Sequence, residues 1–356
     1  MYPILFNPIY KEMIWGGQNL TRMFNRVLPF KKVGESWDVS MRPNEMSIVS
    51  NGIYAGQTFE RLIKSEGGRA EWLGRDFKED APFPLLVKII DANNNLSVQV
   101  HPNDEQAKFL SNEISGKNEM WYILQAPENA GLIIGLKDGA KREMLREALE
   151  SGDAEQYFSY LPVKPGDVIH IPAGLLHAIT AGVMAAEIQQ NSDITYRVYD
   201  YNRVGPDGKP RQLHIKKALD VIDFDNRLKK IKISGLETHD GDTVYYIANP
   251  YFCVILYQFK HIKYLREISD PNKFFIYTCL KGSCVIKHQN RETPLITGGS
   301  VFIPAGLGEF EIVSDSSDSS RILKSFIPNI DKDFIEPLLK AGYTIEKIFR
   351  ETSVSY

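Results

Sequence analysis

One short segment occurs twice in this chain and constrains the fold more than any other feature. The run PGDVIHIPAGLLH at residues 165–177 is matched by GGSVFIPAGLGEF at residues 298–310. Each copy reads as a glycine turn, a short apolar strand, a second turn at Pro-Ala-Gly and the start of another strand. In the second copy, Glu309 and Phe310 stand where His177 falls in the first. Such a repeat predicts a mainly β protein built from two barrels of one design.

A strand-like stretch ahead of the first copy gathers polar side chains on one face. Residues 96–101, LSVQVH, alternate apolar and polar side chains, so in a strand Ser97, Gln99 and His101 share a face. Burying three polar side chains together is costly unless something satisfies them. A second strand-like run, 119–124, opens with Glu119. Gln99, His101 and Glu119 thus offer an amide oxygen, an imidazole and a carboxylate, which suit a metal ion.

His177, inside the repeated frame, is the candidate for the fourth ligand. A lone histidine is more often an ordinary core or surface residue, but this one follows a turn–strand–turn frame and joins three other candidate ligands. The ligand types alone suit zinc, manganese, iron or nickel. Two histidines and a carboxylate can also hold iron for oxygen chemistry, and Gln99 as a fourth protein ligand counts against that alternative. We therefore expect one divalent metal ion.

Six motifs, in order along the first two hundred residues, resemble those of the type I phosphomannose isomerase family. They are WGGQNL (15–20), GESWDVS (34–40), QVHP (99–102), KNEMWYIL (117–124), PAGLLHAI (172–179) and DITYR (193–197). The resemblance implies zinc as the metal, two cupin (jelly-roll) β-barrels with small helical insertions, and interconversion of mannose 6-phosphate and fructose 6-phosphate. An aldose–ketose isomerase moves a proton between neighbouring carbons through an enediol, so it needs an acid/base and stabilisation of the developing charge.

The resemblance also implies catalytic roles for charged residues near the ligands. Glu187 precedes Arg197 by the spacing at which the family carries a candidate base, although a structural salt bridge between the two is an equal alternative. Arg197 is expected to stabilise the enediolate. Lys117, two residues before Glu119, is expected to face the same cavity.

Three further residues are predicted to bind substrate. Arg203 matches a basic position of the family pattern and is expected to hold the phosphate. Ser97 is expected to hydrogen-bond substrate oxygens, and Asp193 to orient Arg197. Outside the resemblance, each basic residue would more often be an ordinary solvated surface group.

Composition limits the partners. The chain has 42 lysines and arginines against 45 aspartates and glutamates, a formal net charge of −3, which argues against nucleic acid or a membrane surface as partner. An anionic substrate then needs a local basic patch. No apolar run approaches membrane-spanning length, and the N-terminus lacks a signal-peptide layout. The three cysteines lie in apolar strand-like runs, which predicts reduced thiols in a cytoplasmic protein, a monomer or weak homodimer.

A stretch rich in charge and glycine at residues 223–243 predicts the domain boundary. We expect a catalytic, metal-binding cupin domain with helical insertions at 1–225. A second, degenerate and metal-free cupin domain with an apolar interior and C-terminal helical turns is expected at 240–356. Capping residues and apolar periodicity predict helices at 58–64, 102–110, 138–150 and 213–222.

Three functions stay open. The leading one is a metal-dependent mannose-6-phosphate isomerase. The second keeps the site but changes the chemistry, as another sugar-phosphate isomerase or an iron cupin dioxygenase. The third is a non-catalytic, sugar-binding pair of cupins with a structural metal. Lys117, Glu187 and Arg197 near the ligands favour an enzyme, because a structural metal needs no open, charged cavity.

Overall fold

Strands make up most of the regular structure, as the repeat predicts. The structure is a computed structural model and describes residues 1–356 except 66, 206–207, 226–230, 240 and 316–318. We call residues 10–36 and 88–232 the first unit, and residues 1–9, 37–87 and 233–356 the second unit; each is compact. In the described part of the chain, no helix is long and apolar enough to cross a membrane.

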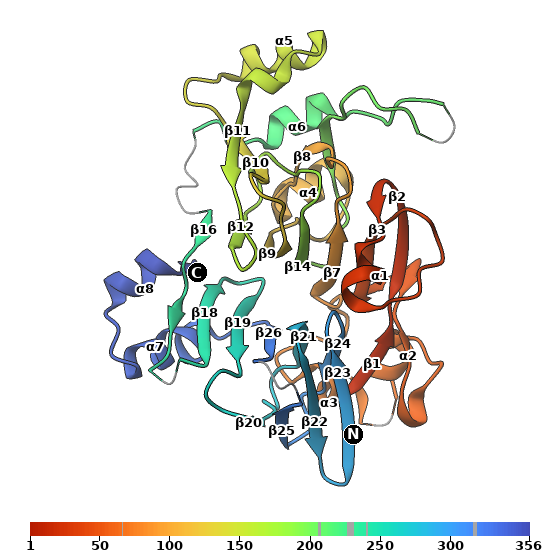
Figure 1. Cartoon of the computed structure of the whole chain (residues 1–356), viewed down its shortest axis with the longest axis vertical. Helices are drawn as coiled ribbons and strands as arrows, with labels where there is room; N and C mark the ends of the chain where they lie inside the picture. Colours follow the sequence, from red (N-terminus) through yellow and green to blue (C-terminus); the bar gives the residue numbers. More distant parts are fainter. Residues whose placement is uncertain (66, 206–207, 226–230, 240, 316–318) are drawn as a thin grey trace. The chain divides into compact units, whose positions relative to one another are not determined.

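Two sheets form most of the first unit. The larger has the strand order β16-β12-β9-β14-β7-β3-β2, and β9 lies between β12 and β14 in Figure 1. Its strands are β2 (Ile9–Gly17), β3 (Val33–Val39), β7 (Leu85–Asp91), β9 (Glu119–Gln125), β12 (Val168–Ile171), β14 (Met184–Gln190) and β16 (Lys232–Ile233). The smaller sheet has the order β11-β10-β13-β8-β15. Its strands are β8 (Val98–Val100), β10 (Gly131–Leu136), β11 (Phe158–Pro162), β13 (His177–Ile179) and β15 (Tyr196–Tyr199).

The core of the first unit lies between these sheets. Trp121 and Ile169 of the larger sheet and Leu132 and Ile179 of the smaller one belong to a single buried cluster. Alternate side chains of each strand therefore enter a shared apolar layer, the arrangement of a two-sheet sandwich.

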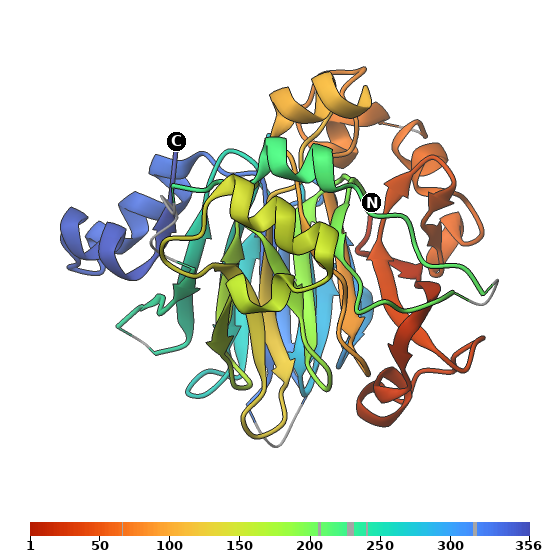
Figure 2. The same cartoon turned by 90° about the horizontal axis from the view of Figure 1, so that it is seen from above.

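Helices cover the other face of the smaller sheet. They are α4 (Asp104–Ser111), α5 (Arg142–Ser151) and α6 (Ile215–Val221), and Figure 2 shows the yellow α5 and the green α6 against the strands. Leu145 of α5 and Leu219 of α6 pack in one cluster with Val98 and Val100 of β8. The predicted helices are confirmed; a capping box at Asn103 begins α4. The remaining helix of the first unit is α1 (Asn19–Phe24).

The second unit also contains two main sheets. The larger has the order β17-β18-β19-β26-β21-β24-β1-β6, with β27 beside β18, and the smaller has the order β20-β25-β22-β23. The larger sheet comprises β1 (Ile4–Asn7), β6 (Ile48–Val49), β17 (Leu236–Glu237), β18 (Thr243–Ala248), β19 (Cys253–Gln258), β21 (Phe275–Lys281), β24 (Ser300–Ile303), β26 (Arg321–Phe326) and β27 (Ser353–Val354). The smaller comprises β20 (Tyr264–Ile268), β22 (Ser283–His288), β23 (Arg291–Ile296) and β25 (Glu309–Ser314). The other elements are the hairpin β4 (Met41–Arg42) and β5 (Glu45–Met46), and helices α2 (Phe59–Ile63), α3 (Gly68–Leu73), α7 (Glu336–Lys340) and α8 (Ile345–Glu351).

The strand order shows that the two units are copies of one design. The order β12-β9-β14-β7 recurs as β24-β21-β26-β19, and β11-β10-β13-β8 recurs as β23-β22-β25-β20. The repeated segments make the same turn, because Leu175 N donates to Pro172 O and Leu307 N to Pro304 O, both at 3.2 Å. The predicted correspondence of the two segments is confirmed.

The two compact units divide the chain differently from the predicted domains. Residues 1–9 and 37–87 group with residues 233–356, because β1 pairs with β24 and contributes to the sheet of the second unit. Such units record which residues pack together, so the domain assignment of 1–225 and 240–356 stays a prediction.

An aromatic side chain occupies the position of one candidate metal ligand inside the second unit. Phe275 pairs with Ile303 as Glu119 pairs with Ile171, and each isoleucine precedes a Pro-Ala-Gly turn. Phe275 therefore occupies the position of Glu119. Phe310 is buried in the core of the second unit.

The prediction of an apolar interior for the second unit is wrong in one respect, because this interior holds an ion pair. Lys324 pairs with Tyr277 as Glu187 pairs with Trp121 in the first unit, so an ammonium replaces a carboxylate. Its Nζ lies 2.9 Å from Glu267 Oε2, with both side chains largely buried. A buried lysine is tolerated only when it is paired, and Glu267 supplies the charge.

Replacing Lys324 with Met should destabilise the protein by about 3 kcal/mol, because Glu267 would keep a buried charge without its cation. The thermal unfolding midpoint would measure the loss. The double variant Lys324→Met/Glu267→Gln should recover part of it, since both charges are then removed. A single variant as stable as the parent would show that this ion pair does not stabilise the second unit.

Candidate metal centre

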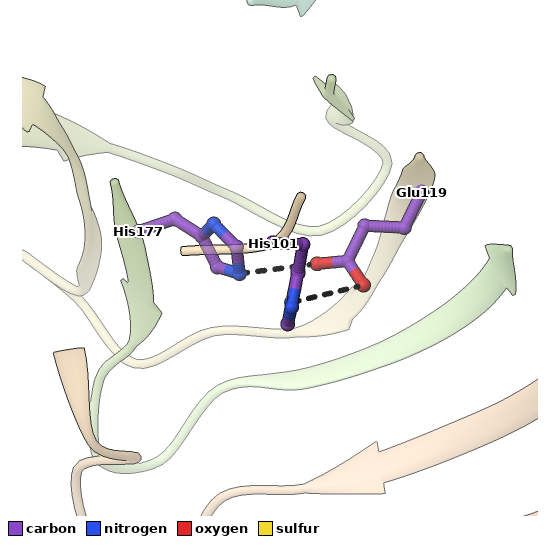
Figure 3. Close-up of side chains that lie close together, drawn as sticks. All are labelled: His101, Glu119 and His177. Carbon is purple, nitrogen blue, oxygen red and sulfur yellow. Dashed lines mark ion pairs between the residues drawn. The ribbon is translucent and has the colours of Figure 1, made fainter. Parts of the chain in front are cut away.

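Three predicted ligands converge from three strands of the first unit. His101 follows β8, Glu119 begins β9 and His177 begins β13. One ligand atom from each lies within 4.8 Å of the others, and Figure 3 shows both imidazoles turned toward the carboxylate. It is the one such group of histidine, cysteine and carboxylate side chains in the described part of the chain.

Backbone carbonyls fix the tautomer of both histidines. His177 Nδ1 donates to Leu175 O at 2.8 Å, and His101 Nδ1 donates to Ile194 O at 2.6 Å. Burial, and then the charge of Lys117, hold the pKa of His101 well below its usual value, so this ring is neutral. Each imidazole therefore presents the lone pair of Nε2 to the centre.

The centre brings buried electron-pair donors together. His177 Nε2 lies 3.2 Å from Glu119 Oε1, and His101 Nε2 lies 3.8 Å from Oε2. All three residues are at most 1% exposed. Glu119 Oε1 and His177 Nε2 make no hydrogen bond with any described residue, whereas the ammonium of Lys117 contacts Glu119 Oε2 and His101 Nε2. Buried acceptors of this kind are costly unless a cation binds them, so the three side chains fit a divalent metal ion.

Gln99 lies beside this group. It pairs with His177 across β8 and β13, and it lines the adjoining cavity. This position is compatible with an amide oxygen as the fourth ligand. That role stays a prediction.

Lys117 adds positive charge directly at the centre. Its Nζ lies 2.6 Å from Glu119 Oε2, 3.3 Å from His101 Nε2 and 4.0 Å from Glu187 Oε1. Burial acts to raise the pKa of Glu119, but Lys117, together with the neighbouring histidines, holds that pKa well below its usual value. Lys117 thus keeps the candidate ligand ionised and faces the cavity, as its strand spacing predicts.

A cavity of about 320 Å³ opens beside the candidate ligands. Among the predicted site residues, its lining includes Ser97, Gln99, Lys117, Glu187, Asp193 and Arg197. The sequence analysis missed Trp15, Glu35, Lys88 and Arg211, which also line it. Lysine in the buried strand LLVKIID was a usable signal for Lys88, because a buried charge requires a partner. No pattern in the sequence marks Arg211.

Glu187 lies deep in this cavity. Its Oε1 accepts a hydrogen bond from Trp121 Nε1 at 2.9 Å, and its Oε2 lies 3.6 Å from Lys88 Nζ. Burial, and then the charge of Glu119, raise the pKa of Glu187 to about 7. The alternative, a salt bridge between Glu187 and Arg197, is not among the contacts of Glu187 with described residues. Lys88 is the cationic partner of Glu187 instead.

Lys88 is held between two carboxylates. Its Nζ lies 3.3 Å from Glu35 Oε2 as well as 3.6 Å from Glu187. Burial acts to lower the pKa of Lys88, but Glu35 and Glu187, together with other nearby carboxylates, hold that pKa above its usual value. Lys88 is therefore a fixed positive charge beside Glu187.

Arg197 reaches the cavity from β15. Its Nε donates to Ser97 Oγ at 3.2 Å and its Nη1 to Gln212 O at 2.9 Å. Asp193 is exposed in the same lining and forms no hydrogen bond or ion pair with Arg197 among the described contacts. Ser97, rather than Asp193, therefore orients Arg197 in this structure.

Arg203 is not among the residues that line the cavity. Its guanidinium donates to the side chain of Asp200 and to the carbonyl oxygens of Asp200 and Asn95. Its predicted contact with phosphate stays untested, and these bonds show a side chain already held by the protein.

Two family descriptions match separate parts of the chain. "Phosphomannose isomerase type I, catalytic domain" matches residues 4–127. "Mannose-6-phosphate isomerase, cupin domain" matches residues 242–317. The second match lies entirely within the second unit.

Relatives match over most of their length. The probable mannose-6-phosphate isomerase GmuF of Bacillus subtilis is 38% identical over 311 residues, which cover 87% of this chain and 96% of that protein. The mannose-6-phosphate isomerase of Streptococcus mutans is 33% identical over 326 residues, covering 89% and 98%. The crystal structure of the mannose 6-phosphate isomerase from Bacillus subtilis matches with a TM-score of 0.81 and 32% identity, covering 91% of this chain and 99% of that one. With this agreement in sequence, fold and centre, the chain belongs to the type I phosphomannose isomerase family and has its cupin fold.

Proposed function

We propose that this chain interconverts mannose 6-phosphate and fructose 6-phosphate with one divalent metal ion, zinc, as cofactor. The observation that carries the proposal is the convergence of His101, Glu119 and His177 beside a cavity lined by charged side chains. Zinc has no redox chemistry and suits nitrogen and oxygen ligands, which fits an isomerase better than iron does.

His101, Glu119 and His177, with Gln99 as the proposed fourth ligand, would hold the metal. When bound, the ion supplies Lewis acidity that polarises the substrate oxygens. A purely structural metal would not require Lys117, Glu187 and Arg197 in an adjoining cavity, which disfavours the non-catalytic alternative. The proposed location is the cytoplasm, which suits the three buried free cysteines, Cys253, Cys279 and Cys284.

Glu187 is the proposed acid/base. Conversion of the aldose to the ketose requires removal of the proton on C2 and its return to C1 through an enediol. Trp121 donates to Oε1 of Glu187 and Lys88 faces Oε2, so the carboxylate is fixed in orientation. Oε2 makes the weaker of these contacts and is assigned the proton transfer.

The remaining charged residues are proposed to bind and stabilise the substrate. Arg197 would offset negative charge as the enediolate forms, and Lys117 would donate to a substrate oxygen near Glu119. Ser97 would hydrogen-bond the sugar and hold Arg197, whereas Asp193 would accept from a sugar hydroxyl. All four line the cavity.

Removal of the metal by a chelator should abolish isomerisation, and zinc should restore it. His177→Ala should lose bound metal and activity together, because it leaves Gln99, His101 and Glu119 as an incomplete set of ligands. Metal analysis and a coupled assay for fructose 6-phosphate measure both quantities. His170→Gln, at a partly buried histidine outside the group, is the matched control and should retain the metal. A folded, metal-free and fully active His177→Ala enzyme would contradict the proposal.

Glu187→Gln should lower kcat at least about a hundredfold, because general acid–base catalysis contributes on that scale. Metal content should stay at the parental level, since Glu187 is not one of the proposed ligands. Exchange of the substrate C2 hydrogen with deuterated water gives a direct readout of proton transfer and should fall with kcat. Normal exchange in this variant would exclude Glu187 as the base.

A further inference from the structure

Two arginines of the first unit bind a single carboxylate, and a third lines the same cavity as one of them. Asp200 Oδ1 lies 2.5 Å from Arg203 Nη2 and 2.6 Å from Arg211 Nη2, and Oδ2 accepts from Arg211 Nε at 2.8 Å. Arg197 is the third guanidinium: burial, and then the charge of Arg211, lower its pKa. One carboxylate leaves this cluster with excess positive charge, as an anion site requires.

The hydrogen bonds divide the arginines into two kinds. Every nitrogen of the Arg203 guanidinium donates to Asp200 or to Asn95 O, and its plane lies over the Tyr201 ring with Cζ 5.2 Å from the centroid. Every nitrogen of Arg203 is thus engaged within the protein, and the residue lies outside the cavity lining. Its role is to hold Asp200.

Arg211 and Arg197 each line the cavity and retain a donor group. Arg211 Nη1 and Arg197 Nη2 make no hydrogen bond with any residue that the structure describes, while the other nitrogens hold Asp200, Ser97 or Gln212 O. Asp193 lies in the same lining and pairs with neither arginine among the described contacts. Guanidinium N–H groups with no protein acceptor suit the oxygens of a phosphate.

The basic end of the cavity, near Ser97, is separated from the candidate ligands along one strand. Ser97, Gln99 and His101 alternate along the β8 segment, so Ser97 lies roughly 13 Å along the strand from His101, at about 3.3 Å per residue. The backbone of Arg197 pairs with Gln99 and its guanidinium bonds to Ser97, so Arg197 lies between the two ends. Asp200, which holds Arg211, follows Tyr199, the partner of Val98 toward the far end. An open-chain hexose 6-phosphate has its carbonyl and its phosphate at opposite ends, which matches the separation of the two groups.

We propose that Arg211 is a specificity-determining residue that binds the phosphate of the substrate, with Asp200 fixing its guanidinium and Arg203 holding Asp200. This inference rests on the proposed isomerase function. It assigns to Arg211 the role that the family pattern gave to Arg203. Arg197 keeps its proposed role toward the enediolate.

Arg211→Gln should raise KM for mannose 6-phosphate roughly tenfold to a hundredfold, the loss expected when a hydrogen bond between charged partners is removed. Its kcat should change little, because the phosphate is bound equally in the ground and transition states. The inhibition constant of inorganic phosphate should rise by a similar factor. Turnover of unphosphorylated mannose, which has no phosphate to lose, should be unaffected by the substitution.

Matched variants distinguish a residue that binds the phosphate from one that only positions another side chain. Arg203→Gln should raise KM less than Arg211→Gln, since it acts only through Asp200. Arg211→Lys keeps the charge without the paired bonds to Asp200 and should be intermediate; it also serves if Arg211→Gln fails to fold. Arg146→Gln, on the exposed face of α5, controls for loss of an arginine elsewhere. Arg197→Ala should instead lower kcat roughly a hundredfold.

A larger rise in KM and in the phosphate inhibition constant for Arg203→Gln than for Arg211→Gln would overturn the inference. So would a parental KM in an active Arg211→Gln enzyme. If the parent enzyme shows no isomerase activity, the proposed function fails instead. Calorimetric titration with inorganic phosphate then decides the anion site alone, with weaker binding to Arg211→Gln as the supporting result and equal binding as the contrary one.

Discussion

The first unit depends on a local electrostatic requirement: two imidazole nitrogens and a carboxylate, all buried, face one another, and no proton lies between His177 Nε2 and Glu119 Oε1. The carbonyls of Leu175 and Ile194 create the requirement, because they accept the Nδ1 proton of each histidine and leave each Nε2 with a lone pair. Only a cation satisfies such a group at low cost. The strands that position it are thus committed to metal binding by their backbone hydrogen bonds as well as by the ligands.

The second unit meets the same requirement differently. With the same strand order, it places Phe275 at the position of Glu119 and Lys324 at the position of Glu187. The ammonium of Lys324 lies 4.0 Å from the centroid of the Phe275 ring and pairs with Glu267, so the cation is part of the chain. Among the described residues, the second unit holds no group of histidine and carboxylate side chains comparable to that of the first. The first unit therefore carries the residues for chemistry, and the second unit uses the same positions for packing.

Much of this arrangement could be predicted from sequence, because it depends on local patterns. A period of two places Gln99 and His101 on one face, and the repeated turn places His177 at the start of a strand. Arg203 and Arg211 lie in one polar stretch, and only the lining of the cavity in the folded protein shows which of them faces it. Lysines inside apolar strands, such as Lys324, signal a buried partner, but the partner comes from a distant strand that the sequence does not identify.

The division of charge explains how an acidic chain can bind an anionic sugar phosphate. A formal net charge of −3 provides no long-range attraction, so binding must come from local groups. Asp200 serves this purpose by holding Arg203 and Arg211 against their mutual repulsion. Because it is shared, it does not neutralise the cluster, and donors of Arg211 and Arg197 remain directed to the cavity. Partly buried charges of this kind are screened by salt less than exposed ones. Selection for phosphate therefore arises from how a few side chains are fixed, and not from the overall charge of the protein.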